Sequence, residues 1–392
     1  MSSKIKSYFR IEYLLLFLCS IQFLSYFNPI IYLLFLYLIF KNKIDLSACR
    51  TVHFLTIVLF AVLYFLFIVE NAVITDYITW IVSYIIGFSL VKDKKSMLIV
   101  LLIMGLGNGF YSTLISIDNY IHYGLNVGAR VLSAVWWDGE VSATAHSCMF
   151  LIFSGLLYPM LFIYKSSFSF KILMVLFCIS LCLSAIMSAS RSELLYPPVI
   201  IVLTAIFYGI KTSSVKHFNY LIFITVILVI LYTFDIFHIR TFFENQFIFV
   251  RFTEKYDGGI VENARVGSWP LFFNNFGKYL FGGLNTINPL LYMHNMFLDT
   301  FAFTGIFPFM LLIIIVFQSC KSLYKISKIG DAFEADLFFG VMIAFLLIFN
   351  TEPILQASSW FFSFYLIVFG MLDKRLVLLK RNKMNRATLV VS

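Results

Sequence analysis

Two arginines and one histidine in the second half of the chain have side chains suited to chemistry at a sugar diphosphate. Arg191 stands in the stretch Ser188-Ala-Ser-Arg-Ser-Glu193, and Arg265 stands four residues before Trp269. His294 follows 29 residues after Arg265. Guanidinium groups bind phosphate through paired, charge-assisted hydrogen bonds, and a histidine near neutrality can accept a proton from a hydroxyl.

Together these three residue types predict glycosyl transfer from a lipid-linked diphosphate. The arginines would stabilise the departing pyrophosphate, and His294 would activate the acceptor hydroxyl, so no metal or other cofactor is required. Arg191 and His294 also have structural alternatives. Arg191 could pair with Glu193 or extend its guanidinium to the membrane surface, and His294 could be an interfacial side chain at the start of a helix.

Composition places these residues on an all-α, polytopic membrane protein. Of the 392 residues, 61% are hydrophobic and only 12% are charged, whereas a soluble domain has roughly 25% charged residues. A membrane-spanning helix needs about 20 mainly apolar residues, and the chain contains about twelve such runs. The runs are 11–26, 28–40, 52–70, 74–91, 96–117, 142–164, 169–189, 193–210, 218–235, 294–317, 335–351 and 355–372.

The distribution of lysine and arginine orients these spans, because basic residues gather in cytoplasmic loops. With both termini cytoplasmic, the outer segments hold Arg130, Arg191, Arg240, Arg251, Lys255, Arg265 and Lys278, and the other 22 of the 29 basic residues lie inside. The prediction is a single integral membrane domain, 1–392, with a large extracytoplasmic loop, 236–293, between spans 9 and 10. The basic residues lie in short gaps between apolar runs, which argues against a nucleic-acid partner. The first two runs predict a hairpin that turns at Asn28-Pro29.

Three motifs resemble those of the O-antigen polymerase and ligase superfamily. The Ser-Arg-Ser stretch around Arg191 is similar to its Ser-Arg motif. Arg265 with Trp269, followed by Phe281-Gly-Gly, resembles its Arg-x3-Trp…Gly-x-Gly pattern, although Leu284 breaks the glycine spacing. His294-Asn295 with Gly305 resembles its entry to the next span. The resemblance covers roughly residues 185–310.

The resemblance implies an inverting glycosyltransferase in the bacterial cytoplasmic (inner) membrane, with its active site facing the periplasm. It implies an undecaprenyl-diphosphate-linked glycan as donor and as acceptor, with membrane lipid around the protein. A chain-length regulator could join these partners. In this reading Arg191 and Arg265 hold the diphosphate and His294 is the base. The short gap between Arg265 and His294 favours a polymerase of repeat units over a ligase acting on lipid A-core. A lipid-linked oligosaccharide transporter is the alternative from another class, although the chain lacks two related halves.

Further polar residues near the outer side complete the expected substrate-binding set. We expect Asn295, Trp269, Glu352 and Trp137 to contact the substrate.

Other uses remain open for several outer residues. Trp136 and Trp137 could instead anchor the chain at the interface, Asp138 and Glu140 could hold a divalent metal, and Glu352 could be a solvated helix-end carboxylate. Asp299 could orient Asn295 or His294, and His146 and Glu70 are expected at the interface.

Overall fold

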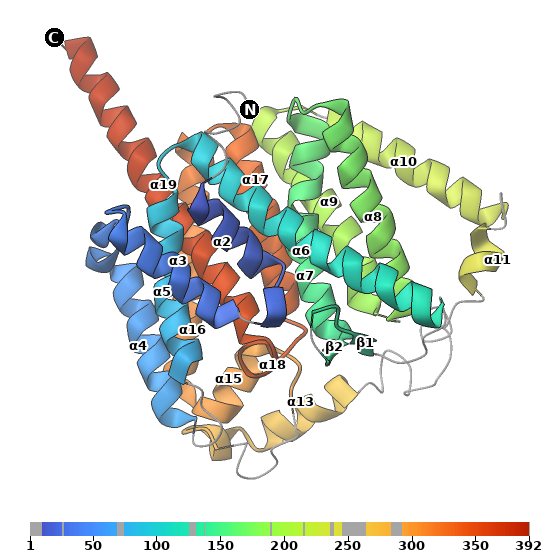
Figure 1. Ribbon diagram of the computed structural model, residues 1–392, viewed down its shortest axis with the longest axis horizontal. Helices are drawn as coiled ribbons and strands as arrows, with labels where there is room; N and C mark the ends of the chain where they lie inside the picture. The colour runs from blue at the N-terminus through green and yellow to red at the C-terminus, as the bar shows by residue number, and fades with distance from the viewer. Residues whose placement is uncertain are drawn as a thin grey trace. The chain divides into compact units, whose positions relative to one another are not determined.

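The computed structural model describes most of the chain and shows a helical protein (Figure 1). The described residues are 10–25, 27–68, 74–124, 131–136, 138–188, 190–214, 216–235, 239–244, 264–283 and 292–391. Among them, the only strands are β1 (Val131–Ser133) and β2 (Glu140–Ser142), which pair antiparallel as one small hairpin. The all-α fold class is therefore confirmed, with this hairpin as a small addition.

Every predicted apolar run contains helix within its described residues. In chain order the helices are α2 (Ile11–Ser20), η1 (Phe23–Ser25), α3 (Phe27–Phe40), η2 (Leu46–Arg50), α4 (Val52–Phe67), α5 (Ile74–Leu90), α6 (Lys94–Tyr123), α7 (Ala143–Tyr158), η3 (Pro159–Ile163), α8 (Phe168–Met187), α9 (Arg191–Thr212), α10 (Lys216–Thr233), α11 (Ile239–Glu244), α13 (Ala264–Asn274), η5 (Phe276–Tyr279), α15 (Met296–Thr304), α16 (Ile306–Ile329), α17 (Ala332–Phe349), α18 (Ile354–Ala357) and α19 (Ser359–Val391). Within the described ranges, six helices are long and apolar enough to cross a membrane. These are α6, α7 with η3, α8, α9, α16 and α17.

Two predicted spans are interrupted in the structure. The run 294–317 divides at Gly305, which has a φ angle of 86° and separates α15 from α16. The run 355–372 begins with the short helix α18, and α19 starts anew after Ser358. The first break lies in the middle of its run and the second near the start of its run, so in both places local backbone conformation outweighs hydropathy.

The first predicted turn also lies elsewhere. The chain leaves α2 at Ile21 and turns through Gln22, Leu24 and Ser25, all with positive φ angles. The expected turn at Asn28-Pro29 is therefore misplaced. Pro29 instead stands in the first turn of α3, where its missing N–H costs no helical hydrogen bond.

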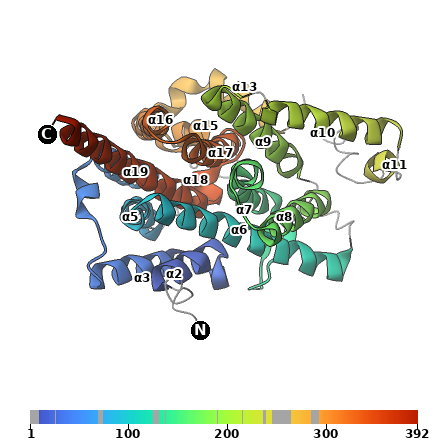
Figure 2. The ribbon, with the colours of Figure 1, turned by 90° about the horizontal axis from the view of Figure 1, so that it is seen from above.

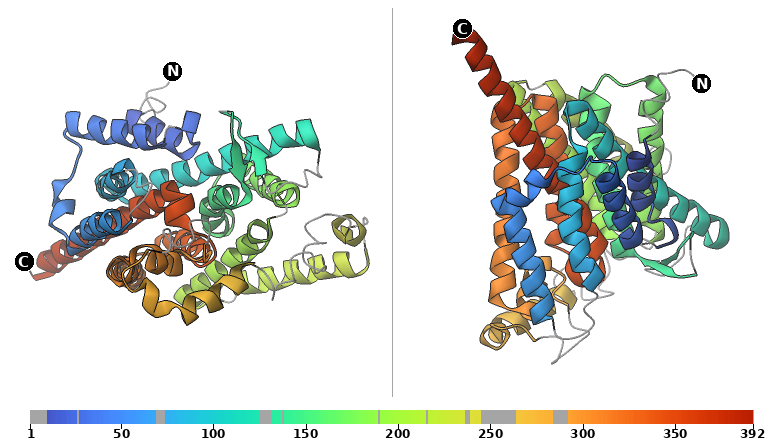
Figure 3. Two further views of the ribbon diagram at one scale, coloured as in Figure 1. Left: turned by 90° about the horizontal axis from the view of Figure 1, so that it is seen from below. Right: turned by 60° about the vertical axis from the view of Figure 1, so that its left-hand side comes forward.

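The chain forms two compact units. Unit 1 comprises Met1–Gly107, Ser268–Asp331 and Phe345–Ser392, and unit 2 comprises Asn108–Gly267 and Ala332–Ala344. In unit 1, α5 and α19 pack along each other, as the view from above shows (Figure 2). The helix α16 packs against both α4 and α19, and the C-terminal turns of α19 project beyond the other helices of unit 1 (Figure 3).

The close approach of α5 and α19 depends on small residues. A Cβ atom on Gly87 would lie 1.9 Å from the carbonyl oxygen of Ile367. The neighbouring core contains the buried ring of Trp80, which stacks on Phe60 at 5.7 Å. Glycine at a helix interface allows this backbone contact, which is typical of helices packed in membranes.

In unit 2, α7 is buried along almost its whole length and packs on α9. The β1–β2 hairpin is fixed to α6 by Asn119, whose side chain donates to Ser133 O and accepts from Ser133 N, both at 2.9 Å. Trp136 in this hairpin stacks on the buried ring of Tyr111 at 5.9 Å. Trp136 therefore packs partly against protein.

We predict that Gly87→Ala destabilises the protein by about 1–3 kcal/mol or more, because the added methyl overlaps the α19 backbone. Thermal unfolding of the purified protein measures this. Gly277→Ala is the matched control, since a Cβ there meets nothing within 4 Å. Equal melting of the two variants would contradict the close packing of α5 and α19.

Candidate functional site

His294 lies in a turn that a buried carboxylate holds from both sides. Asp299, on the first turn of α15, accepts the Met293 N–H at Oδ1 (2.7 Å) and the Asn295 N–H at Oδ2 (3.0 Å). His294 lies between these two amides and has a φ angle of 50°, which is uncommon for a residue with a side chain. Asp299 therefore positions His294, which is one of the two uses left open by the sequence.

Asn295 connects this turn to the next helices of unit 1. Its Oδ1 accepts the N–H groups of Phe297 (3.0 Å) and Leu298 (3.1 Å), so it is the N-cap of α15. Its Nδ2 donates to the carbonyl of Asn350 at 3.2 Å. Both polar atoms of its side-chain amide thus form hydrogen bonds within the protein. The expected contact of Asn295 with the substrate stays a prediction.

Glu352 approaches the imidazole of His294 from the loop after α17. The carboxylate oxygen Oε2 lies 3.7 Å from Nδ1 of His294. Glu352 has 2% of its side chain exposed, whereas His294 has 35% exposed. At this distance the pair is an electrostatic contact, longer than a hydrogen bond. A carboxylate on the Nδ1 side favours the proton there and leaves Nε2 able to accept another.

The residues of the two later sequence motifs meet at this turn. The Trp269 indole donates to the carbonyl of Met293 at 3.0 Å. Gly283 N donates to Phe303 O at 3.1 Å, and Ile306 N donates to Leu280 O at 3.0 Å. These bonds tie the Phe281-Gly-Gly turn to the end of α15.

Two glycines make this contact possible. A Cβ atom on Gly282 would lie 2.5 Å from Phe303 O, and one on Gly305 would lie 2.7 Å from Leu280 O. Both have φ angles in the region that favours glycine, 83° and 86°. The backbone crossing formed by Leu280–Gly283 and Phe303–Ile306 is called the glycine clasp below.

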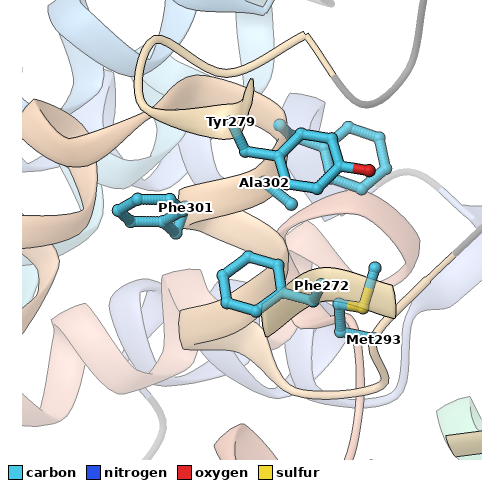
Figure 4. Packing of buried hydrophobic residues seen from close by; sticks show 6 residues of the cluster. Phe272, Tyr279, Met293, Phe301 and Ala302 are labelled. Carbon is cyan, nitrogen blue, oxygen red and sulfur yellow. The ribbon is translucent and has the colours of Figure 1, made fainter. Parts of the chain in front are cut away.

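An aromatic cluster supports the clasp (Figure 4). Phe272 lies parallel to Tyr279 with centroids 6.0 Å apart, and Phe276 stacks on Phe301 at 4.5 Å. Met293, immediately before His294, is fully buried in the same cluster. The turn that carries His294 is therefore held against a buried aromatic cluster through Met293.

Arg191 is the first residue of α9 in unit 2. Ser190 is the N-cap of this helix, and its hydroxyl accepts the Glu193 N–H at 3.4 Å. Arg191 is half-buried, and it forms no ion pair with any side chain that the structure describes. The alternative that Arg191 pairs with Glu193 is wrong, because Glu193 is fully buried against His146.

His146 and Glu193 form a buried polar network that the sequence analysis missed. The His146 Nδ1 atom lies 2.9 Å from Glu193 Oε1, and its Nε2 lies 2.7 Å from Ser112 Oγ. Ser184 donates to Glu193 Oε1, and Ser188 donates to Oε2 at 3.2 Å. His146, expected at the interface, is fully buried. Ser184 on α8 and Ser188 at its C-cap are four residues apart, and this spacing, which marks one helix face, was the available signal.

The remaining predicted site residues are only partly described. Arg265 lies in α13, but its side chain is outside the described residues, as are Trp137 and Glu70. Arg191 and Arg265 belong to unit 2, whereas His294, Asn295, Trp269 and Glu352 belong to unit 1. Asp138 and Glu140 are exposed.

No model of a known protein family matches the chain. A search of curated proteins also finds no match.

We predict that Asp299→Ala destabilises the protein by about 2–4 kcal/mol, since two buried N–H groups lose a charged acceptor. Asp299→Asn keeps one acceptor oxygen and is expected to cost less. Thermal unfolding at pH 7.5 gives the comparison, with exposed Asp138→Ala as the control. An Asp299→Ala variant as stable as the control would refute the positioning role.

We also predict opposite results for two residues that are neighbours in sequence. Glu193→Ala destabilises by about 3–5 kcal/mol, because it leaves His146 and two serines buried without their acceptor. Arg191→Ala changes stability by less than about 1 kcal/mol, as expected for a half-buried cation that pairs with none of the described carboxylates. Chemical denaturation of both variants tests this. If both variants lost the same free energy of unfolding, Arg191 would have a structural role after all.

Proposed function

We propose that the protein is a metal-independent inverting glycosyltransferase that polymerises undecaprenyl-diphosphate-linked oligosaccharide repeat units. The single observation that carries the proposal is the convergence of Trp269, the Phe281-Gly-Gly turn and His294 on the glycine clasp and the adjoining turn. These residues are up to 25 positions apart in sequence, and they belong to two motifs of the resemblance. Their meeting supports the idea that the motifs are parts of one site.

The arrangement around His294 suits a general base. Its ring is partly exposed, its backbone is held by Asp299, and its Nδ1 side faces Glu352. In the proposed reaction the acceptor hydroxyl oxygen forms a bond to the anomeric carbon of the donor. The bond from that carbon to the diphosphate oxygen breaks, and the electron pair leaves with the diphosphate. His294 takes the hydroxyl proton, and a single displacement inverts the anomeric carbon.

Arg191 suits the leaving group in this scheme. It stands at the N-terminus of α9, where the helix dipole favours an anion, and its neighbour Glu193 is occupied by His146. We assign Arg191 and Arg265 to the departing diphosphate, because a guanidinium stays charged and can hold two phosphate oxygens at once. Glu352, Asn295, Trp269 and Trp137 remain the proposed substrate contacts.

The proposed setting is the outer face of the bacterial cytoplasmic membrane. Twelve spans with both termini cytoplasmic follow from the alternation of basic and apolar segments. In that topology Arg191, Arg265 and His294 all face the periplasm, where lipid-linked glycans would be joined.

We predict that His294→Ala slows polymerisation by about 10²–10⁴-fold, the usual contribution of a general base. Arg191→Ala and Arg265→Ala are each expected to cost on the order of 10²-fold through weaker charge stabilisation. The measurement is the length distribution of glycan made from purified lipid-linked repeat units. His122→Ala and Arg240→Ala are matched controls, because both side chains are exposed and predicted to lie outside.

The outcomes separate the competing functions. Full activity in all three variants would refute the catalytic assignment, and loss of activity with EDTA would refute a metal-independent reaction. A gel of the surface glycan from cells lacking the gene distinguishes the two transferases. Single repeat units on the core indicate a missing polymerase, whereas long chains retained on carrier lipid indicate a missing ligase. Accumulation of lipid-linked units on the cytoplasmic side would indicate a transporter instead.

A further inference from the structure

Unit 1 has a second polar region far from His294, at the other end of α16. A groove of about 570 Å³ lies among the first residues of α4, the later turns of α16 and the middle of α19. Lys321 and Lys325 are 15 and 19 residues beyond Ile306, so they lie roughly 22–28 Å along the helix from the glycine clasp. The hydrocarbon core of a membrane is about 30 Å thick. The groove therefore lies about one membrane thickness away from the glycine clasp, measured along α16.

Three lysines line this groove. Lys321, Lys325 and Lys380 are exposed, and none forms an ion pair with a residue in the described ranges. The lining contains one carboxylate, that of Asp373. Three lysines against one aspartate leave an excess of positive charge, which favours an anionic ligand.

Asp373 is already occupied by the protein. Its Oδ2 lies 2.6 Å from His53 Nδ1 and accepts the Tyr84 hydroxyl at 2.6 Å, and its Oδ1 accepts the Ser322 hydroxyl at 2.7 Å. The carboxylate is 5% exposed. These bonds join α4, α5, α16 and α19 and give the groove a fixed floor. The lysines thus stand on a rigid frame rather than on a loop.

Apolar side chains continue the groove on its open side. Val52, Phe317 and Val377 line it and are 70%, 65% and 48% exposed. Cations beside exposed apolar groups fit an amphiphile whose anionic head meets the lysines and whose chains lie on the apolar surface. A freely soluble phosphate would use only the lysines. The apolar margin on a candidate spanning helix therefore favours a lipid.

We propose that this groove binds the phosphate headgroup of an anionic phospholipid of the cytoplasmic leaflet, at a site separate from the one containing His294. Lys321 and Lys325, one helical turn apart on α16, hold the phosphate together with Lys380 of α19. Phe317 and Val377 contact the acyl chains. The bound lipid stabilises the pairing of α16 with α19.

The test is lipid binding to the full-length protein by native mass spectrometry, with phosphatidylglycerol and phosphatidylcholine as probes. We expect the wild-type protein to prefer phosphatidylglycerol. The triple variant Lys321→Gln/Lys325→Gln/Lys380→Gln should bind phosphatidylglycerol on the order of a hundredfold more weakly, at about fivefold per lysine. Thermal unfolding in phosphatidylcholine checks that the variant is folded.

A matched triple variant removes the same charge outside the groove. Lys41, Lys92 and Lys383 are exposed and have no ion pair within the described part of the chain. Their change to glutamine should alter phosphatidylglycerol binding by less than about threefold, as rim charges contribute little. Equal weakening in both triples would show diffuse attraction and overturn the proposal. Equal binding of both lipids to the wild-type protein would also overturn it.

A third arm separates lipid from free phosphate. Millimolar inorganic phosphate should leave phosphatidylglycerol bound and should not raise the melting temperature of lipid-free protein. Full displacement of the lipid with matching stabilisation would assign the groove to a soluble phosphate compound and refute the lipid. None of these outcomes depends on glycosyl transfer, so the result stands apart from the proposed function.

Discussion

The Asp299 carboxylate accepts the amides of Met293 and Asn295, and His294 lies between them with a positive φ angle. Such a backbone conformation costs about 1–3 kcal/mol and persists only where its surroundings fix it. The same turn provides the carbonyl of Met293 to Trp269 and the N-cap of α15 through Asn295. The direction of α15, the anchoring of Trp269 and the exposure of the imidazole therefore all depend on one buried acid.

The glycine clasp extends this constraint into the long segment that precedes His294. Two backbone hydrogen bonds and two close contacts join Leu280–Gly283 to Phe303–Ile306. The segment is thereby tied to the start of α16, a helix long enough to span a membrane. A functional group held by packed helices keeps its geometry better than one on a free loop. This explains how residues from the segment that precedes His294 could act with a fixed partner.

The sequence predicted the structure best where hydropathy determines it. It predicted least where one backbone angle or one side-chain contact determines it. Long runs of Leu, Ile and Phe located every helix in the predicted spans, whereas the break at Gly305 depends on one backbone angle. The alternative of an Arg191–Glu193 pair failed because residues two apart on a helix do not face each other. Glu193 instead meets His146, 47 residues earlier, and no local pattern encodes such a distant partner. The positioning role of Asp299 could be predicted because the two amides that it accepts, those of Met293 and Asn295, lie within six residues of it in sequence.

The buried His146–Glu193 pair also has a consequence for biosynthesis. α7, which carries His146, is synthesised first, and α9, which carries Glu193, follows after α8. An unpartnered carboxylate in hydrocarbon costs at least several kcal/mol. The partners of Glu193 come from α7 and from the end of α8, so the polar group of α9 is satisfied only when the three helices are packed together. We therefore expect α7, α8 and α9 to assemble in the membrane as one unit.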